Sequence, residues 1–151
     1  MNLILDIGNT SVKAAIFEGR DLVVTDRIAG TGQEAIREFC REARIEKAIV
    51  SSVASDPSET VGWLRGEGCY VHQLTWQSKL PFKNMYQTPA TLGADRLAAV
   101  AGAISQFGKS NILIIDAGSA ITYDLVTKAV FRGGTISPGM EMRFKALHTF
   151  T

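Results

Sequence analysis

The sequence has little cysteine, little proline and no excess of charge of either sign, and each shortage excludes a class of protein. Its 151 residues include 2 cysteines and 4 prolines, and 16 basic side chains nearly balance 15 acidic ones. Cys40 and Cys69 form no C-x-x-C pair and have no neighbouring histidine, which argues against a zinc site and fits reduced thiols. No run of five like charges occurs, so nothing predicts a nucleic-acid partner.

Long apolar runs are missing as well. The longest apolar stretch with helical character, residues 97–104, contains Gly102 and falls far short of the roughly 18 residues that a membrane span needs. The apolar run at the amino terminus is broken by Asp6 and follows no basic segment, so it does not resemble a secretory signal. We therefore expect a cytoplasmic protein without membrane association. Its composition, 46% hydrophobic and 21% charged, is typical of a chain that forms a core.

The order of apolar patterns and turn residues predicts an α/β fold. Three β-rich runs come first and are separated by turn residues, which indicates a meander. An amphipathic helix, a buried strand, a second helix, another strand and a long helix follow. The expected order is therefore β-β-β-α-β-α-β-α. The expected ranges are strands at 3–5, 12–17 and 22–25, a helix at 33–44, a strand at 47–53, a helix from 57 to about 65, a strand at 69–74 and a helix ending near 107.

The beginning of the sequence recurs 110 residues later. Residues 113–119, LIIDAGS, match residues 3–9, LILDIGN, with Asp116 aligned to Asp6. Such a repeat predicts two related lobes, the first at 1–110 and the start of a second at 111–151. Because 151 less 110 leaves only 41 residues, we expect the second lobe to be incomplete, with three strands and one helix. The expected ranges are 111–117, 120–126 and 129–136 for the strands and a helix from about 139. We also expect apolar residues of its sheet to lack cover, including Ile114, Ile121 and Val130.

Both repeated turns carry residues suited to phosphate. A turn with a carboxylate and a glycine, such as Asp6 and Gly8, can aim N–H groups at a phosphate while the carboxylate holds a hydrated Mg²⁺. One such turn alone is also ordinary hairpin chemistry. The second copy, at Asp116 and Gly118, favours a two-sided phosphate clamp in which both carboxylates face one cleft.

Two charged residues at the start of the long helix are candidates for the acceptor site. Asp95 shares a helix face with small residues, so it is a candidate base for the acceptor hydroxyl. It is equally an ordinary carboxylate near a helix start, where the macrodipole stabilises it. Arg96 is a candidate for binding a carboxylate of the acceptor through the parallel N–H groups of its planar guanidinium, but a solvated arginine is the more ordinary interpretation.

Lys13 also has two interpretations. It either reaches a phosphate or occupies the exposed face of its strand.

Four motifs in this order resemble the type III pantothenate kinases of bacteria, within the acetate and sugar kinase/actin-like ATPase superfamily. They are DIGNTSVK at 6–13, YQTP at 86–89 with GADR at 93–96, DAGSAIT at 116–122 and GGTISPG at 133–139. The resemblance implies duplicated actin-like (ribonuclease H-like) lobes and ATP-dependent phosphorylation of pantothenate to 4′-phosphopantothenate, the first step of coenzyme A synthesis. It also implies Mg²⁺, a monovalent cation (K⁺ or NH₄⁺) and a homodimer.

The resemblance also implies a role for each matching residue. Asp95 would be the general base, Asp6 would position Mg²⁺ and Asp116 would sit at the monovalent cation. Ser119 stands where the family often has threonine, a change that keeps the hydroxyl. The nucleotide and its phosphates would be bound by Asp6, Gly8, Asn9, Thr10, Ser11, Lys13, Gly118, Ser119 and Thr122. The pantothenate pocket would be lined by Tyr86, Gly93, Ala94, Asp95 and Arg96.

Three other interpretations remain open. The first is another kinase of the same superfamily, acting on a sugar or a carboxylate, because the paired Asp-x-Gly hairpins are common to the whole group. The second is a nucleotide-binding regulatory module, against which Asp95 argues. The third is an inactive fragment of a longer enzyme.

Overall fold

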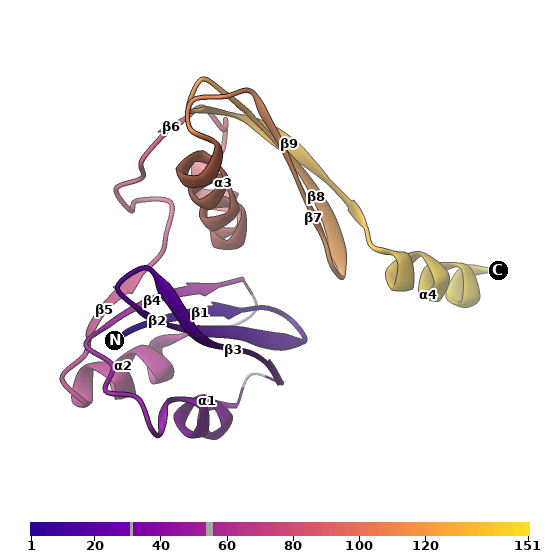
Figure 1. The fold of residues 1–151 in the computed structure, drawn as a ribbon. Helices are drawn as coiled ribbons and strands as arrows, with labels where there is room; N and C mark the ends of the chain where they lie inside the picture. The colour runs from indigo at the N-terminus through magenta and orange to yellow at the C-terminus, as the bar shows by residue number, and fades with distance from the viewer. Residues whose placement is uncertain (31, 54–55) are drawn as a thin grey trace. The chain divides into compact units, whose positions relative to one another are not determined.

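The computed structural model describes residues 1–30, 32–53 and 56–151 of the chain (Figure 1). Its contacts divide the chain into two compact units, each built around one sheet. The first unit comprises residues 1–78 and 93–95, and the second comprises residues 79–92 and 96–151. Among the described residues, no helix is long and apolar enough to span a membrane.

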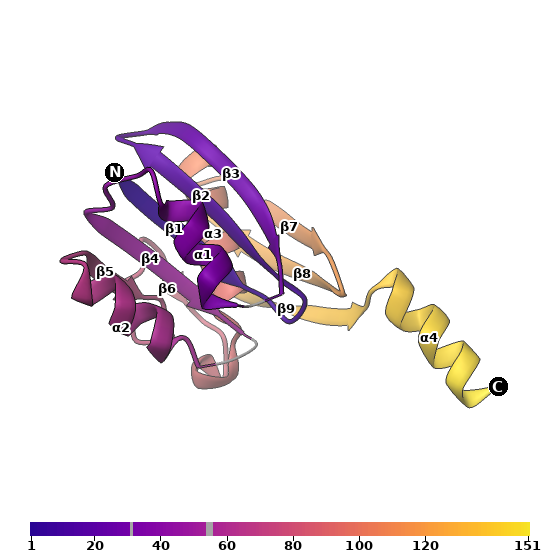
Figure 2. The ribbon, with the colours of Figure 1, turned by 90° about the horizontal axis from the view of Figure 1, so that it is seen from below.

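The first unit is a five-stranded sheet covered by two helices. Its strand order is β3-β2-β1-β4-β5, with β1, β2 and β3 antiparallel and β4 and β5 parallel to β1. Helices α1 and α2 lie on the same face of this sheet, as Figure 2 shows from the helical side. The elements are β1 (Asn2–Ile7), β2 (Ser11–Glu18), β3 (Asp21–Ala29), α1 (Gln33–Cys40), β4 (Lys47–Ser52), α2 (Ser58–Gly66) and β5 (Tyr70–Gln73).

The two-residue period of β1 decides which side chains meet the helices. Leu3, Leu5 and Ile7 are buried in one core cluster with Ile36 of α1 and Leu64 of α2. Successive side chains of a strand point to opposite faces, so Asp6 is directed away from that core. The local hydrophobic pattern therefore places a carboxylate at the end of β1 on the face that the helices leave uncovered.

The second unit contains a four-stranded sheet of order β6-β9-β8-β7. Strands β7, β8 and β9 form an antiparallel meander, and the short β6 pairs with β9 in parallel. Phe131 in β9 is fully buried, with the rings of Phe82 and Tyr86 packed against it at centroid distances of 6.3 Å and 6.1 Å. The elements are β6 (Lys83–Asn84), the 3-10 helix η1 (Pro89–Thr91), α3 (Ala94–Phe107), β7 (Ile112–Ala117), β8 (Ala120–Thr127), β9 (Val130–Pro138) and α4 (Met140–Phe150).

The expected element order is confirmed, with β6 and η1 as unpredicted additions between β5 and α3. Both are too short to show a hydrophobic period. Strand β3 extends to Ala29, past the expected end at 25. This edge strand is exposed along most of its length, so its last residues lack the apolar pattern by which a buried strand is predicted. Contacts group residues 79–92 and most of α3 with the second sheet, while the repeat boundary at residue 110 stays a prediction.

The expectation about uncovered apolar residues is wrong for Ile114. Ile114, Ile121 and Val130 are half-buried, whereas Leu113 and Ile115 are 61% and 56% exposed. Ile114 lies in register with the buried Asp124, on the covered face of the sheet, whereas Ile121 pairs with Ala117 on the same face as Leu113 and Ile115. The exposed face belongs to the alternate residues of β7.

Candidate functional site

The first repeated turn joins β1 to β2 and holds a charged pair. The strand register sets Asp6 opposite Lys13, and Lys13 Nζ lies 3.8 Å from Asp6 Oδ2. The Gly8 N–H donates to the Ser11 carbonyl at 3.1 Å and closes the turn, while Asn9 and Thr10 are exposed. The structure thus brings Lys13 next to the Asp6 carboxylate, before the turn that contains Gly8, Asn9 and Thr10, and the Lys13 side chain is exposed.

The other oxygen of Asp6 is buried without a partner. Among the described residues, Asp6 Oδ1 and Ser51 Oγ are the buried side-chain oxygens that lack a hydrogen bond. The parallel register of β1 and β4 aligns Asp6 with Ser51, so both side chains lie on one face of the sheet. Buried polar atoms normally have partners, so such a pair marks a place for a bound polar group. Carboxylate and hydroxyl oxygens are ligands suited to Mg²⁺ or its water shell.

Ser51 was not predicted as a site residue. It lies in a short buried strand and belongs to no recognisable motif, so its sequence context is that of an ordinary core position. The only signal that pointed toward it is its place at the carboxyl end of β4, next to the end of β1 in a parallel pair.

The second repeated turn joins β7 to β8 and is one residue shorter than the first. Its Gly118 N–H donates to the Ala120 carbonyl at 2.9 Å. The Gly139 N–H donates to the Ser119 carbonyl at 3.0 Å, and a Cβ on Gly139 would collide with the backbone of this turn. Asp116 lies in register with Thr122 in the adjacent strand. The structure therefore brings Asp116, Ser119 and Thr122 together with the end of the GGTISPG motif.

Asp6 and Asp116 belong to different compact units. Each carboxylate stands near the end of the first strand of an antiparallel meander, next to the turn that follows. This equivalence within each sheet agrees with the duplication. The shared cleft between them stays a prediction.

Asp95 stands in the first turn of α3 and is half-buried. A Cβ on Gly93 would collide with Asp95 Oδ1, so the glycine leaves room for this carboxylate. The predicted difference between the helix faces is confirmed, since Ala98 and Gly102 are exposed whereas Leu97 is fully buried.

Arg96 is buried, so the ordinary interpretation of it as a solvated helix residue is wrong. It is only 9% exposed, and its Nε lies 3.0 Å and 3.1 Å from the two carboxylate oxygens of Asp124. Its Nη2 donates to Asp124 Oδ1 at 2.5 Å. The hydrogen bonds to Asp124 raise the pKa of Arg96 above its usual range, so the guanidinium is always charged. Asp124 was missed because one acid in the apolar strand sequence ITYDLV has no motif around it.

An aromatic face completes the surroundings of Arg96. The guanidinium carbon lies 5.5 Å from the centre of the Tyr86 ring, a cation–π distance. The Tyr86 ring in turn stacks on Phe131, and the Tyr86 N–H donates to the Asn84 side chain at 2.9 Å. Tyr86 and Arg96, two residues of the expected acceptor pocket, are thus in contact within the second unit.

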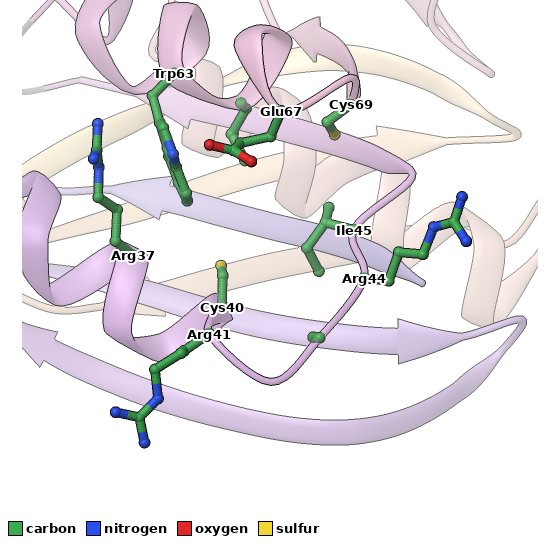
Figure 3. Close-up of a pocket in the computed structure, with 10 residues that line it drawn as sticks. Arg37, Cys40, Arg41, Arg44, Ile45, Trp63, Glu67 and Cys69 are labelled. Carbon is green, nitrogen blue, oxygen red and sulfur yellow. The ribbon is translucent and has the colours of Figure 1, made fainter.

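A separate cavity of about 350 Å³ opens on the helical side of the first sheet, between α1 and α2 (Figure 3). Arg37 lies over the Trp63 ring at 5.1 Å, and Glu67 lines the same cavity. Burial raises the pKa of Cys40 to about 11, so this thiol stays protonated near neutral pH. The cavity lies on the face opposite Asp6 and contains none of the predicted site residues.

Solved structures define the class of this fold. A Campylobacter jejuni protein described as a Baf family transcriptional activator superposes with a TM-score of 0.63 and 24% identity, covering 99% of this chain and 60% of that one. A Sinorhizobium meliloti protein described as a 2-dehydro-3-deoxygalactonokinase superposes with a TM-score of 0.59 and 11% identity, covering 100% of this chain and 57% of that one. At these identities the likeness concerns the fold alone, which is that of the actin-like ATPases and sugar kinases.

Sequence comparison gives the family. A family model described as type III pantothenate kinase matches residues 2–151. Type III pantothenate kinases of Christiangramia forsetii and Bacteroides fragilis are 44% and 41% identical to the chain over its whole length. The chain therefore belongs to the type III pantothenate kinase family. It spans 63% of the length of these two relatives.

Proposed function

We propose that the protein transfers the terminal phosphoryl group of ATP to pantothenate, giving 4′-phosphopantothenate for coenzyme A synthesis. The observation that carries this proposal is the match of a pantothenate kinase family model to residues 2–151, which include all four motifs. Phosphoryl transfer needs positioning, charge neutralisation and a proton acceptor more than covalent help from the protein. Each of these tasks has a candidate residue in the chain.

The turn after β1 is the proposed phosphate and Mg²⁺ site. The unpartnered Oδ1 of Asp6 supports this role, because a hydrated metal ion would supply the missing hydrogen bonds. Bound Mg²⁺ supplies positive charge that stabilises the transferring phosphoryl group. Lys13, 3.8 Å from the other Asp6 oxygen, adds a second positive charge beside the phosphate path. The exposed residues Asn9 and Thr10, together with Ser11, extend the same binding surface.

Asp95 is the proposed general base. The acceptor hydroxyl must lose a proton as it attacks phosphorus, and a carboxylate within hydrogen-bond reach accepts that proton. The space that Gly93 leaves for the Asp95 carboxylate supports this role, because a side chain at position 93 would displace it.

Arg96 and Tyr86 are the proposed contacts for the carboxylate of pantothenate, with Gly93 and Ala94 lining the same pocket. A guanidinium recognises a carboxylate through parallel N–H groups, which sets both affinity and orientation. The burial of Arg96 supports this role, since a desolvated donor discriminates more strongly than a solvated one.

The turn after β7 is the proposed second half of the nucleotide site. We propose that Asp116 holds a monovalent cation and that Gly118, Ser119 and Thr122 lie along the nucleotide. The contact between Gly139 and Ser119 supports a fixed turn at this point.

The arrangement of the whole protein is also part of the proposal. We propose that residues 1–110 and 111–151 derive from two copies of one unit, that the protein is cytoplasmic and that it acts as a homodimer. The repeated hairpins support the first statement, and the exposed apolar residues of β7 support the last.

The test is direct detection of the product. Purified protein is incubated with Mg²⁺, ATP and pantothenate, and 4′-phosphopantothenate is sought by mass spectrometry. A panel of sugars and small carboxylates is run in parallel. Phosphorylation of pantothenate above all other acceptors supports the proposal, whereas preferred phosphorylation of a sugar or a different acid contradicts it.

A further inference from the structure

Ser51 is a buried serine whose hydroxyl has no hydrogen-bond partner. It is 5% exposed and lies near the carboxyl end of β4, on the face of the sheet that α1 and α2 leave uncovered. Lys47 and Ile49, the other residues of β4 on this face, are exposed. Within the described ranges of the chain, Ser51 Oγ shares its lack of a partner with one other buried side-chain oxygen, Asp6 Oδ1. A buried hydroxyl without a partner destabilises a fold, so packing alone does not account for a serine here.

Asp6 presents two different oxygens at this position. The parallel register of β1 and β4 sets Asp6 beside Ser51, with both side chains on one face. Asp6 Oδ2 lies 3.8 Å from Lys13 Nζ, whereas Oδ1 is buried. A carboxylate oxygen has two acceptor positions, so Oδ1 can accept from a serine and from a second donor at the same time. The Ser51 hydroxyl needs no opening to solvent for such a contact, because Asp6 is a side chain of the neighbouring strand.

The segment that carries Asp95 packs at the same end of this sheet. Residues 93–95 belong to the first compact unit, and a Cβ on Gly93 would lie 3.5 Å from Val53 Cγ1. The Val53 N–H donates to the Ile7 carbonyl at 3.1 Å, which joins the chain after β4 to the end of β1. The two unpartnered oxygens therefore lie at the end of the sheet where the proposed base is also located.

We propose that Ser51 is a positioning residue whose hydroxyl donates to Asp6 Oδ1 when Mg²⁺ and ATP are bound, and so fixes the carboxylate that faces the metal's water shell. A serine side chain moves between staggered positions by rotation about one bond, so this contact forms without movement of the backbone. The inference rests on the proposed function, because it takes Asp6 as the Mg²⁺ site. The hydroxyl destabilises the ligand-free fold and stabilises the loaded one, so its removal has opposite effects on stability and on binding.

The test measures both effects in Ser51→Ala, which removes one buried oxygen. Urea unfolding of the ligand-free protein should give an unfolding free energy equal to that of the wild type or higher. Calorimetry should show that ATP with Mg²⁺ binds about 10–100-fold more weakly, the range for a lost hydrogen bond to a charged group. ATP in EDTA should bind within about threefold of its wild-type affinity, because the lost hydrogen bond acts through the metal site.

Two further variants complete the comparison. Ser51→Thr keeps the hydroxyl and suits a strand, so it should bind MgATP within about threefold of the wild type. Ser105→Ala changes an exposed serine of α3 and should bind MgATP as the wild type does. A loss that depends on Mg²⁺ and is rescued by threonine supports the positioning role, since a serine with a purely structural role would affect both forms of ATP alike.

The outcomes separate this inference from the proposed function. Unchanged MgATP binding by Ser51→Ala, or an equal loss with and without Mg²⁺, overturns the positioning role while pantothenate phosphorylation by the wild type still stands. A wild-type protein that binds MgATP but prefers another acceptor overturns the proposed function alone. A wild-type protein that binds no MgATP overturns both.

Discussion

Asp95 is the single residue on which the proposed chemistry depends most directly, because the acceptor hydroxyl must give up a proton. Asp95→Asn removes the basic oxygen and keeps the shape of the side chain. We expect turnover to fall by about 10²–10⁴, the usual contribution of a general base. Nucleotide binding should stay nearly unchanged, as measured by calorimetry with MgATP. Asp26→Asn, an exposed carboxylate in β3, is the matched control. A variant that keeps most of its turnover would remove Asp95 from this role.

Cys40 makes stability depend on alkaline pH. Burial, with a smaller contribution from Cys69, raises the pKa of the Cys40 thiol from 9.0 to about 11 in the folded chain. The folded state therefore holds this proton at pH values where the unfolded chain has released it. The stabilisation is fully present below about pH 9 and is lost as pH rises toward about 11.

Chemical denaturation at a series of pH values measures this effect. We expect the unfolding free energy to decrease between about pH 9 and 11 in the wild type, and to decrease less steeply in Cys40→Ala. A remaining slope in the variant is expected from Cys69, whose thiol pKa burial also raises. Identical slopes in the two proteins would show that the Cys40 proton is not coupled to folding.

Two glycines show how the surroundings of a strand or helix determine the effect of a glycine-to-alanine substitution on stability. Gly134 in β9 faces Asp124 and Arg96 so closely that a Cβ would overlap them, whereas a Cβ on Gly62 in α2 meets nothing within 4 Å. Gly134→Ala should therefore lower the unfolding free energy by about 1–3 kcal/mol through overpacking. Gly62→Ala should raise it by about 0.5–1 kcal/mol, since alanine favours the helix. Urea unfolding of both variants is the measurement, and a destabilised Gly62→Ala together with an unaffected Gly134→Ala would contradict this account.

The ends of strands β1 and β7 show the same design at the scale of elements. Each strand ends in Asp-x-Gly and turns back into an antiparallel partner, and each turn is closed by a glycine N–H that donates to a carbonyl of the returning strand. The turns differ in length by one residue, because β2 begins at Ser11 after three loop residues and β8 begins at Ala120 after two. The repeated acid is therefore preserved at the strand end although the loops that follow have diverged.

The exposed apolar face of the second sheet is expected to determine whether the protein associates with itself. Leu113, Ile115 and Leu125 share this face by strand register and are 61%, 56% and 45% exposed. Exposed apolar patches on a sheet favour association, so we expect the protein to form dimers or larger species at micromolar concentration. Light scattering over a concentration series measures this.

The matched variants for this prediction change only apolar surface. Leu113→Thr combined with Ile115→Thr should shift the protein toward the monomer, because threonine keeps the strand conformation and removes apolar area. Leu22→Thr, which alters an exposed leucine of β3, should leave the association unchanged. A wild-type protein that is monomeric throughout the series would contradict the expectation.

Local patterns were enough to predict most of the elements and the faces on which Asp6, Asp95 and Asp116 lie. The alternation of side chains along β1 places Asp6 on the face opposite Leu3, Leu5 and Ile7, and the recurrence of this pattern at 113–119 places Asp116 on the face opposite Leu113 and Ile115. The bulky stripe of Leu97 and Val100 likewise set Asp95 on the opposite face of its helix. Each of these conclusions depends only on neighbours within a few residues, where the period of a strand or helix determines direction.

Only the tertiary structure revealed the partners that come from distant parts of the chain. Ser51 joins Asp6 because β1 and β4 pair in parallel, 45 residues apart in sequence. Arg96 meets Asp124 across 28 residues, which turns a helix residue that looks solvated into a buried ion pair. A strand pairing or a salt bridge across such separations leaves no periodic trace, because its energy comes from burial and geometry that exist only once the sheets have formed. The sequence by itself therefore determined the family, the repeats and the direction of the acids, while the fold determined what each charge contacts.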